Sequence, residues 1–212
     1  MHQPPLFREE RVEILHDLIA RHPFATLVAA GDGGIEASHL PMLLSPEPAP
    51  LGSLIGHLAR ANPMLADGRD SLHALAVFQG PQAYVSPSWY PSKRAHGRVV
   101  PTWNYVAVHA HGTLARIDDP ARLRDIVERL TAARERRFAA PWSVDDAPAD
   151  FVAGMLKGIV GLELRIERLD GNWKLSQNRA PDDRRGVIAA LEASDDPADR
   201  AVAAAMVARD GD

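Results

Sequence analysis

Residues 75–105 read LAVFQGPQAYVSPSWYPSKRAHGRVVPTWNY, two strand-like runs that converge on an aromatic loop. All three tyrosines of the chain and two of its four tryptophans fall in this window, next to hydroxyl and amide side chains. Rings that carry a polar group suit a wall that is apolar on one side and hydrated on the other. The window therefore predicts much of a pocket for a flat ligand with polar edges.

The chain has 212 residues, 46% of them hydrophobic, which is enough for one substantial core. We expect one domain over residues 1–194 and a helical extension over 195–212. The apolar runs fall short of the roughly 18 residues that span a bilayer, and no signal peptide is visible, so we expect a cytoplasmic protein without a membrane segment. With no cysteine, disulfides and thiolate ligands are excluded. The net charge of −4 restricts any nucleic-acid contact to a local patch.

Strand patterns flank the aromatic window on both sides and predict a mainly antiparallel sheet. Residues 25–30 and 35–39 read as a hairpin around the glycine-rich turn 31–34, and Asp170-Gly171 reads as a second reversal. Further strands are expected at 51–58, 74–78, 82–86, 104–114 and 162–167. Helices are expected at 12–19, 119–137, 145–157, 181–191 and 197–208. The fold class is therefore α+β, mainly β.

Residues 56–63, GHLARANP, form the second informative stretch. A strand ends near His57, and Arg60 and Asn62 follow before Pro63 begins a short helix. An arginine close to backbone donors favours an anion site. A surface arginine beside a strand-end histidine is the alternative interpretation.

Other patterns carry weaker functional signals. His109 and His111 share one strand face, but a metal site needs a third ligand that the sequence does not offer, so we expect no metal. The basic run Arg134 to Arg137 is either a DNA contact or a solvated helix face. Residues 173–179 end a strand with many hydrogen-bond donors. No P-loop, G-x-G-x-x-G or G-x-S-x-G motif occurs, and no catalytic residue is identified.

The parts present match the needs of flavin mononucleotide (FMN). Two strand ends carry cations, His57 with Arg60 and Lys174 with Arg179, beside a loop lined by aromatic, amide and hydroxyl groups. FMN needs a site for its phosphate, donors for its ribityl hydroxyls and a wall for its ring. Haem or a nucleoside would also use much of this set.

Long motifs give the chain a resemblance to the PaiB family, FMN-binding proteins described as negative transcriptional regulators. In order, they are GHLARANP (56–63), FQGPQAYVSPSWYPSK (78–93), VVPTWNYVAVHAHG (99–112), Pro141-Trp142, IVGLEL (159–164) and KLSQNR (174–179). The likeness extends over nearly all of residues 1–192. It implies an FMN-binding split barrel: a six-stranded antiparallel Greek-key barrel with flanking helices, in a homodimer with flavin sites at the interface.

Carried over to this sequence, the resemblance implies three groups of FMN-binding residues. The phosphate side takes His57, Ala59, Arg60 and Asn62. The ribityl chain and ring take Ser86, Trp89, Tyr90, Thr102, Trp103 and Asn104. The residues expected to close the site are Lys174, Ser176, Gln177 and Arg179. The implied function is negative regulation of transcription. The alternative is a flavin-dependent oxidoreductase, a reductase, oxidase or haem-processing enzyme, that does not bind DNA.

Overall fold

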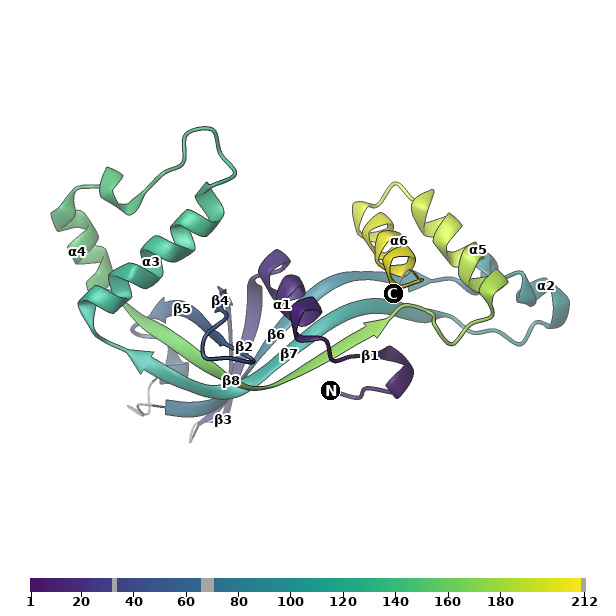
Figure 1. The fold of residues 1–212 in the computed structure, drawn as a ribbon, viewed down its shortest axis with the longest axis horizontal. Helices are drawn as coiled ribbons and strands as arrows, with labels where there is room; N and C mark the ends of the chain where they lie inside the picture. The colour runs from purple at the N-terminus through teal and green to yellow at the C-terminus, as the bar shows by residue number, and fades with distance from the viewer. Residues whose placement is uncertain (32–33, 66–70, 211–212) are drawn as a thin grey trace. The chain divides into compact units, whose positions relative to one another are not determined.

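A computed structural model describes residues 1–31, 34–65 and 71–210 of the chain. Its described strands form one eight-stranded sheet in the order β3-β2-β6-β7-β8-β5-β4, with β1 paired to β8 (Figure 1). The strands are β1 (Arg8–Glu9), β2 (Phe24–Gly31), β3 (Gly34–Pro41), β4 (Leu43–Ser45), β5 (Ser53–Ala59), β6 (Ser71–Val85), β7 (Thr102–Ile117) and β8 (Ile159–Lys174). Strands β1 and β4 are short, so six of these strands are long.

Six α-helices and four 3-10 helices connect or cover these strands within the described ranges. The α-helices are α1 (Val12–Arg21), α2 (Ser92–His96), α3 (Pro120–Glu135), α4 (Ala149–Lys157), α5 (Pro181–Glu192) and α6 (Pro197–Asp210). The 3-10 helices are η1 (Pro5–Phe7), η2 (Pro63–Leu65), η3 (Pro87–Trp89) and η4 (Val144–Asp146). The expected α+β class, mainly antiparallel sheet with flanking helices, is confirmed.

The chain divides into two compact units that share the three longest strands. Unit 1 comprises Met1–Arg11, Gln79–Val108 and Asp170–Asp212, and unit 2 comprises Val12–Phe78 and His109–Leu169. Strands β6, β7 and β8 each contribute residues to both units. The expected domain boundary at residue 194 stays a prediction.

Unit 2 has its core between the sheet and helices α1 and α3. Helix α1 buries Leu15, Leu18 and Ile19 on one face, as its helical spacing predicts. Helix α3 begins at Pro120, where the sequence predicts a helix start, and the side chain of Asp119 caps it by accepting a hydrogen bond from the Arg122 amide at 2.8 Å. Two of its buried residues, Ile126 and Leu130, form an apolar cluster with Ile55 and Ile117. Each such side chain contributes about 1.5–3 kcal/mol of burial energy.

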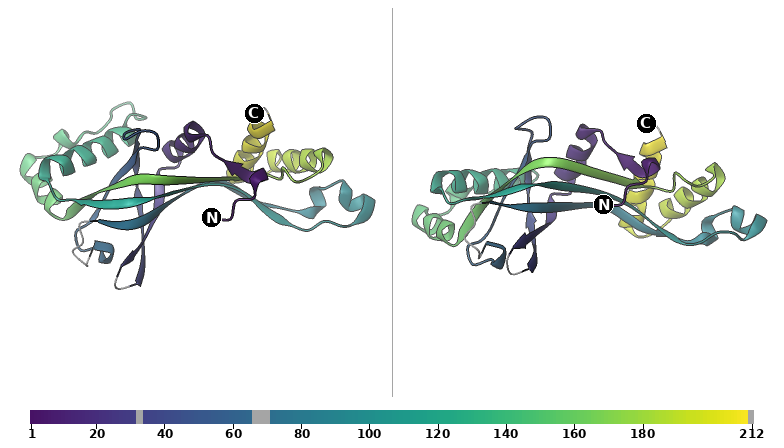
Figure 2. Two further views of the ribbon diagram at one scale, coloured as in Figure 1. Left: turned by 60° about the horizontal axis from the view of Figure 1, so that its bottom comes forward. Right: turned by 90° about the horizontal axis from the view of Figure 1, so that it is seen from below.

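Unit 1 has its core around helices α5 and α6, which lie side by side (Figure 2). Its buried apolar residues there are Val187, Leu191, Val202, Ala203 and Met206. Helix α5 also approaches η3 so closely that a Cβ at Gly186 would lie 2.2 Å from the carbonyl oxygen of Trp89. This contact fixes the backbone of Trp89 on α5.

One expected break between strands and one expected chain reversal are wrong. Residues 74–86 form one strand, β6, and not two, because Gly80 and Pro81 stay extended and the missing proline amide costs a single ladder hydrogen bond. Strand β8 continues through Asp170 and Gly171 because β1 pairs with it, Glu9 opposite Gly171. In the hairpin of β2 and β3, Thr26 faces His39, whereas Asp32 and Gly33 of the expected turn lie outside the described residues.

Candidate functional site

The predicted flavin residues fall into two groups, one in each unit. His57, Ala59, Arg60 and Asn62 belong to unit 2. The other ten belong to unit 1, and they are Ser86, Trp89, Tyr90, Thr102, Trp103, Asn104, Lys174, Ser176, Gln177 and Arg179. Each group has its own geometry.

Two cations at the end of β8 reach the segment that opens β7. The Lys174 Nζ donates to Thr102 Oγ1 at 2.7 Å and to the Trp103 carbonyl at 2.6 Å. The Arg179 Nη2 lies 3.5 Å from the Val100 carbonyl oxygen. Burial, and then the charge of Arg179, lower the pKa of Lys174. The structure therefore brings this predicted cation pair together.

Tyr90 lies beneath the arginine of this pair. The Arg179 guanidinium carbon is 4.8 Å from the centre of the Tyr90 ring, a cation–π contact. The ring is 1% exposed, and the Tyr90 hydroxyl is buried without a hydrogen-bond partner in the described part of the chain. Burial raises the pKa of Tyr90, and the charge and hydrogen-bonding capacity of the nearby Arg179 guanidinium oppose that rise. Buried polar atoms are rarely left unpaired, so this hydroxyl is a candidate for a hydrogen bond to a ligand or a water molecule.

Buried amides and hydroxyls support the turn that joins the two cations. The Ser176 Oγ donates to Asn104 Oδ1 at 3.0 Å, and both side chains are buried. Ser176 has φ of 64°, in the left-handed region, and Gln177 Oε1 accepts from the Leu175 amide at 2.7 Å. A turn fixed in this way holds Lys174 and Arg179 at defined positions.

Sequence reasoning missed Asp183, the buried acid of this group. Its two oxygens accept from the Ser92 amide at 3.0 Å and the Ser92 hydroxyl at 2.6 Å. Burial raises its pKa, but the Ser92 hydrogen bonds and the charges of Arg179 and His96 outweigh burial, so its pKa is lowered. The only signal in the sequence is an acid in the first turn after Pro181, which most helices share.

The aromatic residues predicted for the flavin ring have different degrees of exposure. Trp103 is 48% exposed, donates from Nε1 to Gln82 Oε1 at 3.1 Å and packs edge-on against Tyr84 at 6.1 Å. Trp89 lies in η3 and is half-buried. Just before it in the chain, the Ser86 and Ser88 hydroxyls form a hydrogen bond of 2.6 Å with each other. Exposed rings of this kind are typical of ligand or protein contacts.

In unit 2, Arg60 is bound to neighbours within the same unit. Its Nη1 donates to Asp118 Oδ1 at 2.6 Å, its Nη2 to the Ile159 carbonyl at 2.9 Å and its Nε to the Lys157 carbonyl at 3.2 Å. Hydrogen bonds from Arg116 and Arg60 lower the pKa of Asp118 to about 2. A phosphate at Arg60 would have to compete with this carboxylate.

The other three residues predicted for the phosphate side are Ala59, Asn62 and His57, and each has its own structural setting in unit 2. Ala59 ends β5. The Asn62 amide donates to Ser38 Oγ at 3.0 Å, and its Oδ1 accepts from the Met64 amide at 2.9 Å, so Asn62 caps η2. The His57 Nδ1 is buried without a partner in the described ranges, and burial lowers the pKa of His57. A neutral imidazole of this kind is available to accept or donate one hydrogen bond.

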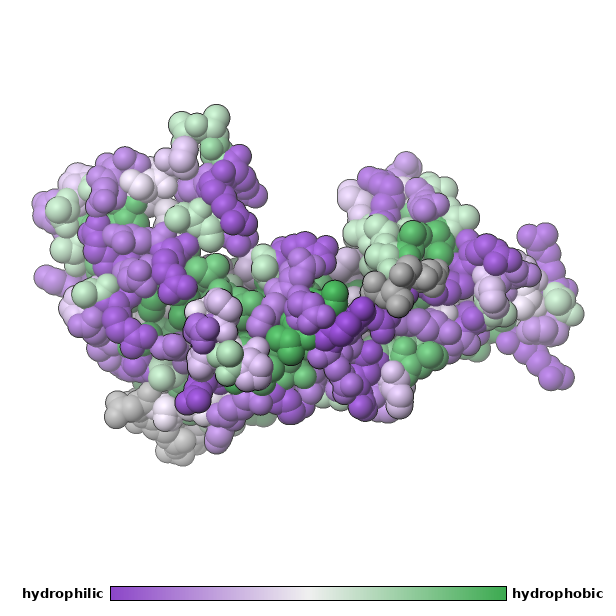
Figure 3. Space-filling model, viewed as in Figure 1, coloured by the Kyte–Doolittle hydropathy of each residue, from purple (hydrophilic) through white to green (hydrophobic). Residues whose placement is uncertain are grey.

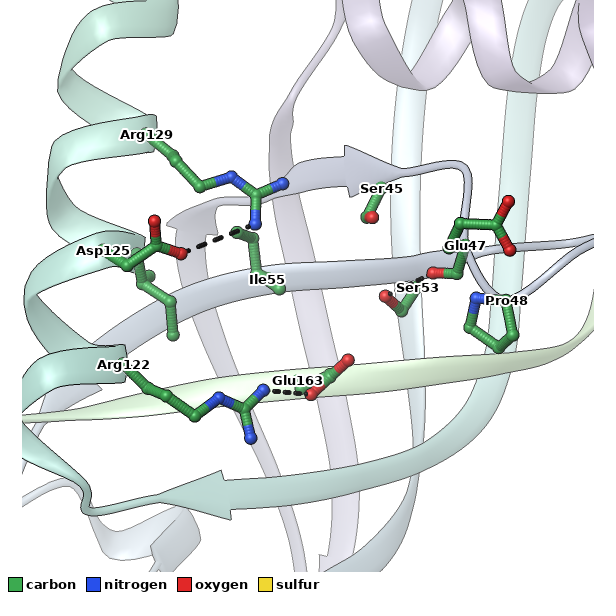
Figure 4. Close-up of a pocket in the computed structure, with 10 residues that line it drawn as sticks. Ser45, Glu47, Pro48, Ser53, Ile55, Arg122, Asp125, Arg129 and Glu163 are labelled. Atoms are coloured by element: carbon green, nitrogen blue, oxygen red, sulfur yellow. Dashed lines mark hydrogen bonds and ion pairs between the residues drawn. The ribbon is translucent and has the colours of Figure 1, made fainter.

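A separate cavity of about 370 Å³ lies in unit 2 between α3 and the β4–β5 strands (Figure 4). Four of its five charged side chains form pairs: Arg122 with Glu163 at 2.8 Å, and Arg129 with Asp125 at 3.7 Å. Ile55 and Ile126 contribute the apolar part of its lining. A second cavity of about 880 Å³ lies along β8 near the 48–51 loop. Neither cavity is lined by a predicted flavin residue.

Two further signals from the sequence, the histidine pair and the basic run, also lie in unit 2. The His109 and His111 rings lie 6.2 Å apart, and no group of three metal-binding side chains occurs in the described ranges. The basic run Arg134 to Arg137 spans the end of α3, and Arg137 stacks on Phe138 at 4.8 Å just beyond it. The surface over α3 is mostly hydrophilic (Figure 3). No helix among the described residues is long and apolar enough to cross a membrane.

The residues of unit 1 fit the demands of a flavin on three observations. The Tyr90 hydroxyl and the Arg179 Nε are buried polar atoms without a partner among the described residues. Lys174 and Arg179 place two positive charges near each other, which favours an anion, and aromatic rings lie beside them. Such a set of donors and rings is suited to bind an anionic, flat ligand.

A solved structure with the same fold is the FAD and heme binding protein from Mycobacterium smegmatis. It superposes with a TM-score of 0.54 at 17% sequence identity, covering 79% of this chain and 73% of that one. The sheet and this likeness define the class: the chain has the split-barrel fold of flavin-binding proteins.

Sequence relatives define the family. The family described as "Putative FMN-binding domain" matches residues 1–168. "Protease synthase and sporulation protein PAI 2" of Bacillus subtilis is 30% identical over 197 residues, 93% of this chain and 92% of that protein. An uncharacterized protein of Emericella nidulans is 34% identical over 219 residues, 87% of each. The chain belongs to the PaiB family of FMN-binding-domain proteins, and this membership supports a flavin cofactor.

Proposed function

We propose that the protein is a cytoplasmic FMN-binding homodimer of the PaiB type that acts as a negative regulator of transcription. The group formed by Lys174, Arg179 and Tyr90 is the observation that supports flavin binding best. Among the described residues, the two cations form no ion pair with a carboxylate, and the buried Tyr90 hydroxyl has no hydrogen-bond partner. FMN is the flavin named in the description of the family. When bound, FMN supplies the electron-transfer chemistry of its own ring, and the chain binds and orients it.

FMN binding is tested by titrating the purified full chain with FMN, riboflavin and FAD and following flavin fluorescence. Binding of FMN in preference to FAD is expected. Preference for FAD would retain a flavin cofactor and reject FMN, since the fold is shared with an FAD-binding protein.

Regulation of transcription rests on the family resemblance and on the basic run after α3. Arg134 lies in the last turn of α3, and the chain as a whole carries a net charge of −4. A DNA-binding dimer would present this run twice. Gel-shift titrations of promoter fragments at several salt concentrations are the measurement, and a steep loss of affinity with salt is expected. DNA affinity that is immeasurable at low salt, with and without FMN, would reject the regulatory function.

The alternative function is a flavin-dependent oxidoreductase that does not bind DNA. The shared fold with a protein that binds FAD and heme favours it, although fold alone does not determine activity. Anaerobic mixing of the FMN-loaded protein with NADH or NADPH is the test. Bleaching of the flavin absorbance supports the oxidoreductase, and no reduction by either donor or by added reductases counts against it.

A further inference from the structure

We propose that Lys174 and Arg179 bind the phosphate of the flavin, and that Arg60 does not. This inference rests on the proposed FMN binding and concerns which cations of the chain hold the anionic end of the cofactor. It reassigns the phosphate from unit 2, where the resemblance puts it, to unit 1.

The first step compares the acidic neighbours of the cations. In the part of the chain that the structure describes, neither Lys174 nor Arg179 forms an ion pair with a carboxylate; their contacts are the Thr102 hydroxyl, two carbonyls and the Tyr90 ring. Asp183 is the acid that senses the Arg179 charge, but both its oxygens accept from Ser92. Two neighbouring cations that are partly removed from water without a counter-ion are unfavourable unless an anion joins them.

The second step counts the donors that remain. An ammonium has three N–H donors and a guanidinium has five. Lys174 uses two of its three, on Thr102 and Trp103. Arg179 makes a long 3.5 Å contact to the Val100 carbonyl and lies over the Tyr90 ring, and its Nε is buried without a partner among the described residues. Its two terminal nitrogens therefore keep N–H donors for phosphate oxygens.

The third step matches charge. A phosphate monoester carries about −1.5 to −2 charges near neutral pH, which two cations compensate. The lowered pKa of Lys174, caused by burial and then by Arg179, agrees with a pair that lacks its anion. At Arg60, in contrast, Asp118 already supplies a carboxylate and two carbonyls accept from the other guanidinium nitrogens. Arg60 thus already has a carboxylate partner, which it shares with Arg116, whereas neither Lys174 nor Arg179 has one among the described residues.

The test uses riboflavin, which is FMN without its phosphate, as the probe of the phosphate contribution. Dissociation constants of both ligands are measured for the wild-type chain and for Lys174→Gln, Arg179→Gln, Arg60→Gln and Arg185→Gln. Charge-assisted hydrogen bonds predict that the wild type prefers FMN over riboflavin about 10- to 100-fold. Lys174→Gln and Arg179→Gln are each expected to reduce this ratio about tenfold while riboflavin affinity changes little.

Arg185→Gln is the matched control, since Arg185 is an exposed arginine of α5 in the same unit, paired with Asp182. Lys174→Arg and Arg179→Lys keep the charge and are expected to retain more of the FMN preference than the glutamine variants, with Arg179→Lys retaining less because an ammonium lacks the planar set of donors. These two variants keep the test valid if a neutral variant does not fold. If Arg60→Gln removes the FMN preference and the unit 1 variants do not, or if the wild type binds both ligands equally, the inference is wrong and flavin binding stands. If the wild type binds neither ligand, the proposed function itself is wrong.

Discussion

At the scale of one residue, Tyr90 places a polar atom in a buried environment. Its hydroxyl is buried without a partner in the described ranges, while Arg179 covers the face of the ring. An unsatisfied buried hydroxyl costs about 1–3 kcal/mol of folding free energy. Retaining a tyrosine in place of a phenylalanine is consistent with a use for the hydroxyl in binding.

Tyr90→Phe is expected to leave the free energy of unfolding of the flavin-free chain unchanged or to raise it by about 1 kcal/mol, because it removes an unpaired hydroxyl. The same change is expected to weaken FMN binding about fivefold, the effect of one lost hydrogen bond. Urea unfolding and FMN titration measure the two effects. A loss of stability with unchanged FMN affinity would show that the hydroxyl serves the fold alone.

Residue types in the sequence predicted the cations and rings of the candidate site, but not their partners. Arg60 and Arg179 look alike in the sequence, each following a strand. Only the structure shows that Asp118, 58 residues further along the chain, reaches Arg60, whereas Arg179 has a ring beneath it. Partners that are distant in sequence have no local signal, so sequence reasoning finds donors and not the acceptors that occupy them.

At the scale of elements, helix α5 contacts η3 through Gly186. A Cβ there would lie 2.2 Å from the Trp89 carbonyl oxygen and 3.3 Å from Pro91 Cδ. Gly186→Ala is therefore expected to lower the free energy of unfolding by about 1–3 kcal/mol, the cost of overpacking, although alanine favours helices. Because the change displaces Trp89, FMN affinity is expected to fall as well.

Gly154→Ala in α4 is the control for this substitution, since nothing lies within 4 Å of its Cβ. It is expected to raise the free energy of unfolding by about 0.5–1 kcal/mol through helix propensity alone. Urea denaturation of both variants measures the difference. Equal effects of the two substitutions would contradict a close contact between α5 and η3.

Strand β1 is tied to α6 by Glu9, a buried acid. Glu9 accepts from Arg11 at 2.7 and 2.9 Å and pairs with Arg209 of α6. The Arg11 hydrogen bond is the largest influence, burial opposes it, and the net effect lowers the pKa of Glu9 from 4.5 to about 2. Because the folded pKa lies below the unfolded one, Glu9 stabilises the fold above about pH 4.5, and this stabilisation is lost as the pH falls toward 2.

Glu9→Gln is accordingly expected to cost about 2–3 kcal/mol of unfolding free energy at pH 7. The difference from wild type should shrink steadily between pH 4.5 and pH 2. Glu10→Gln is the control, because Glu10 is exposed and its ion pair with Arg8, at 3.4 Å, lies on the surface. Its effect on the free energy of unfolding should stay below about 0.5 kcal/mol. A cost for Glu9→Gln that does not vary with pH would show that the glutamate acts through packing.

The elements themselves were largely predictable from local patterns, and their joints were not. Apolar spacing predicted α1 and α3, and proline with an N-cap marked where α3 begins. The prediction of a strand break between residues 78 and 82 was wrong, since β6 is continuous. The interpretation of Asp170-Gly171 as a chain reversal was also wrong, because a short motif does not reveal pairing with a strand as distant as Arg8–Glu9.

For the whole molecule, we expect a homodimer with flavin sites at its interface, because the resemblance implies one and exposed rings such as Trp103 and Tyr84 suit a contact surface. Light scattering should give twice the 23.1 kDa mass of one chain. Trp103→Ala is expected to weaken both dimerisation and FMN binding. A protein of 23.1 kDa that binds FMN at full stoichiometry would contradict an interfacial flavin site.

Flavin binding is the central claim, and the most direct test is a titration of the purified, flavin-free full chain with FMN, followed by flavin fluorescence and by absorbance after gel filtration. We predict saturable binding of one FMN per chain and a yellow protein that keeps its flavin through the column. If FMN, riboflavin and FAD all fail to bind at concentrations up to about 1 mM, where the binding free energy is only about −4 kcal/mol, the claim is contradicted.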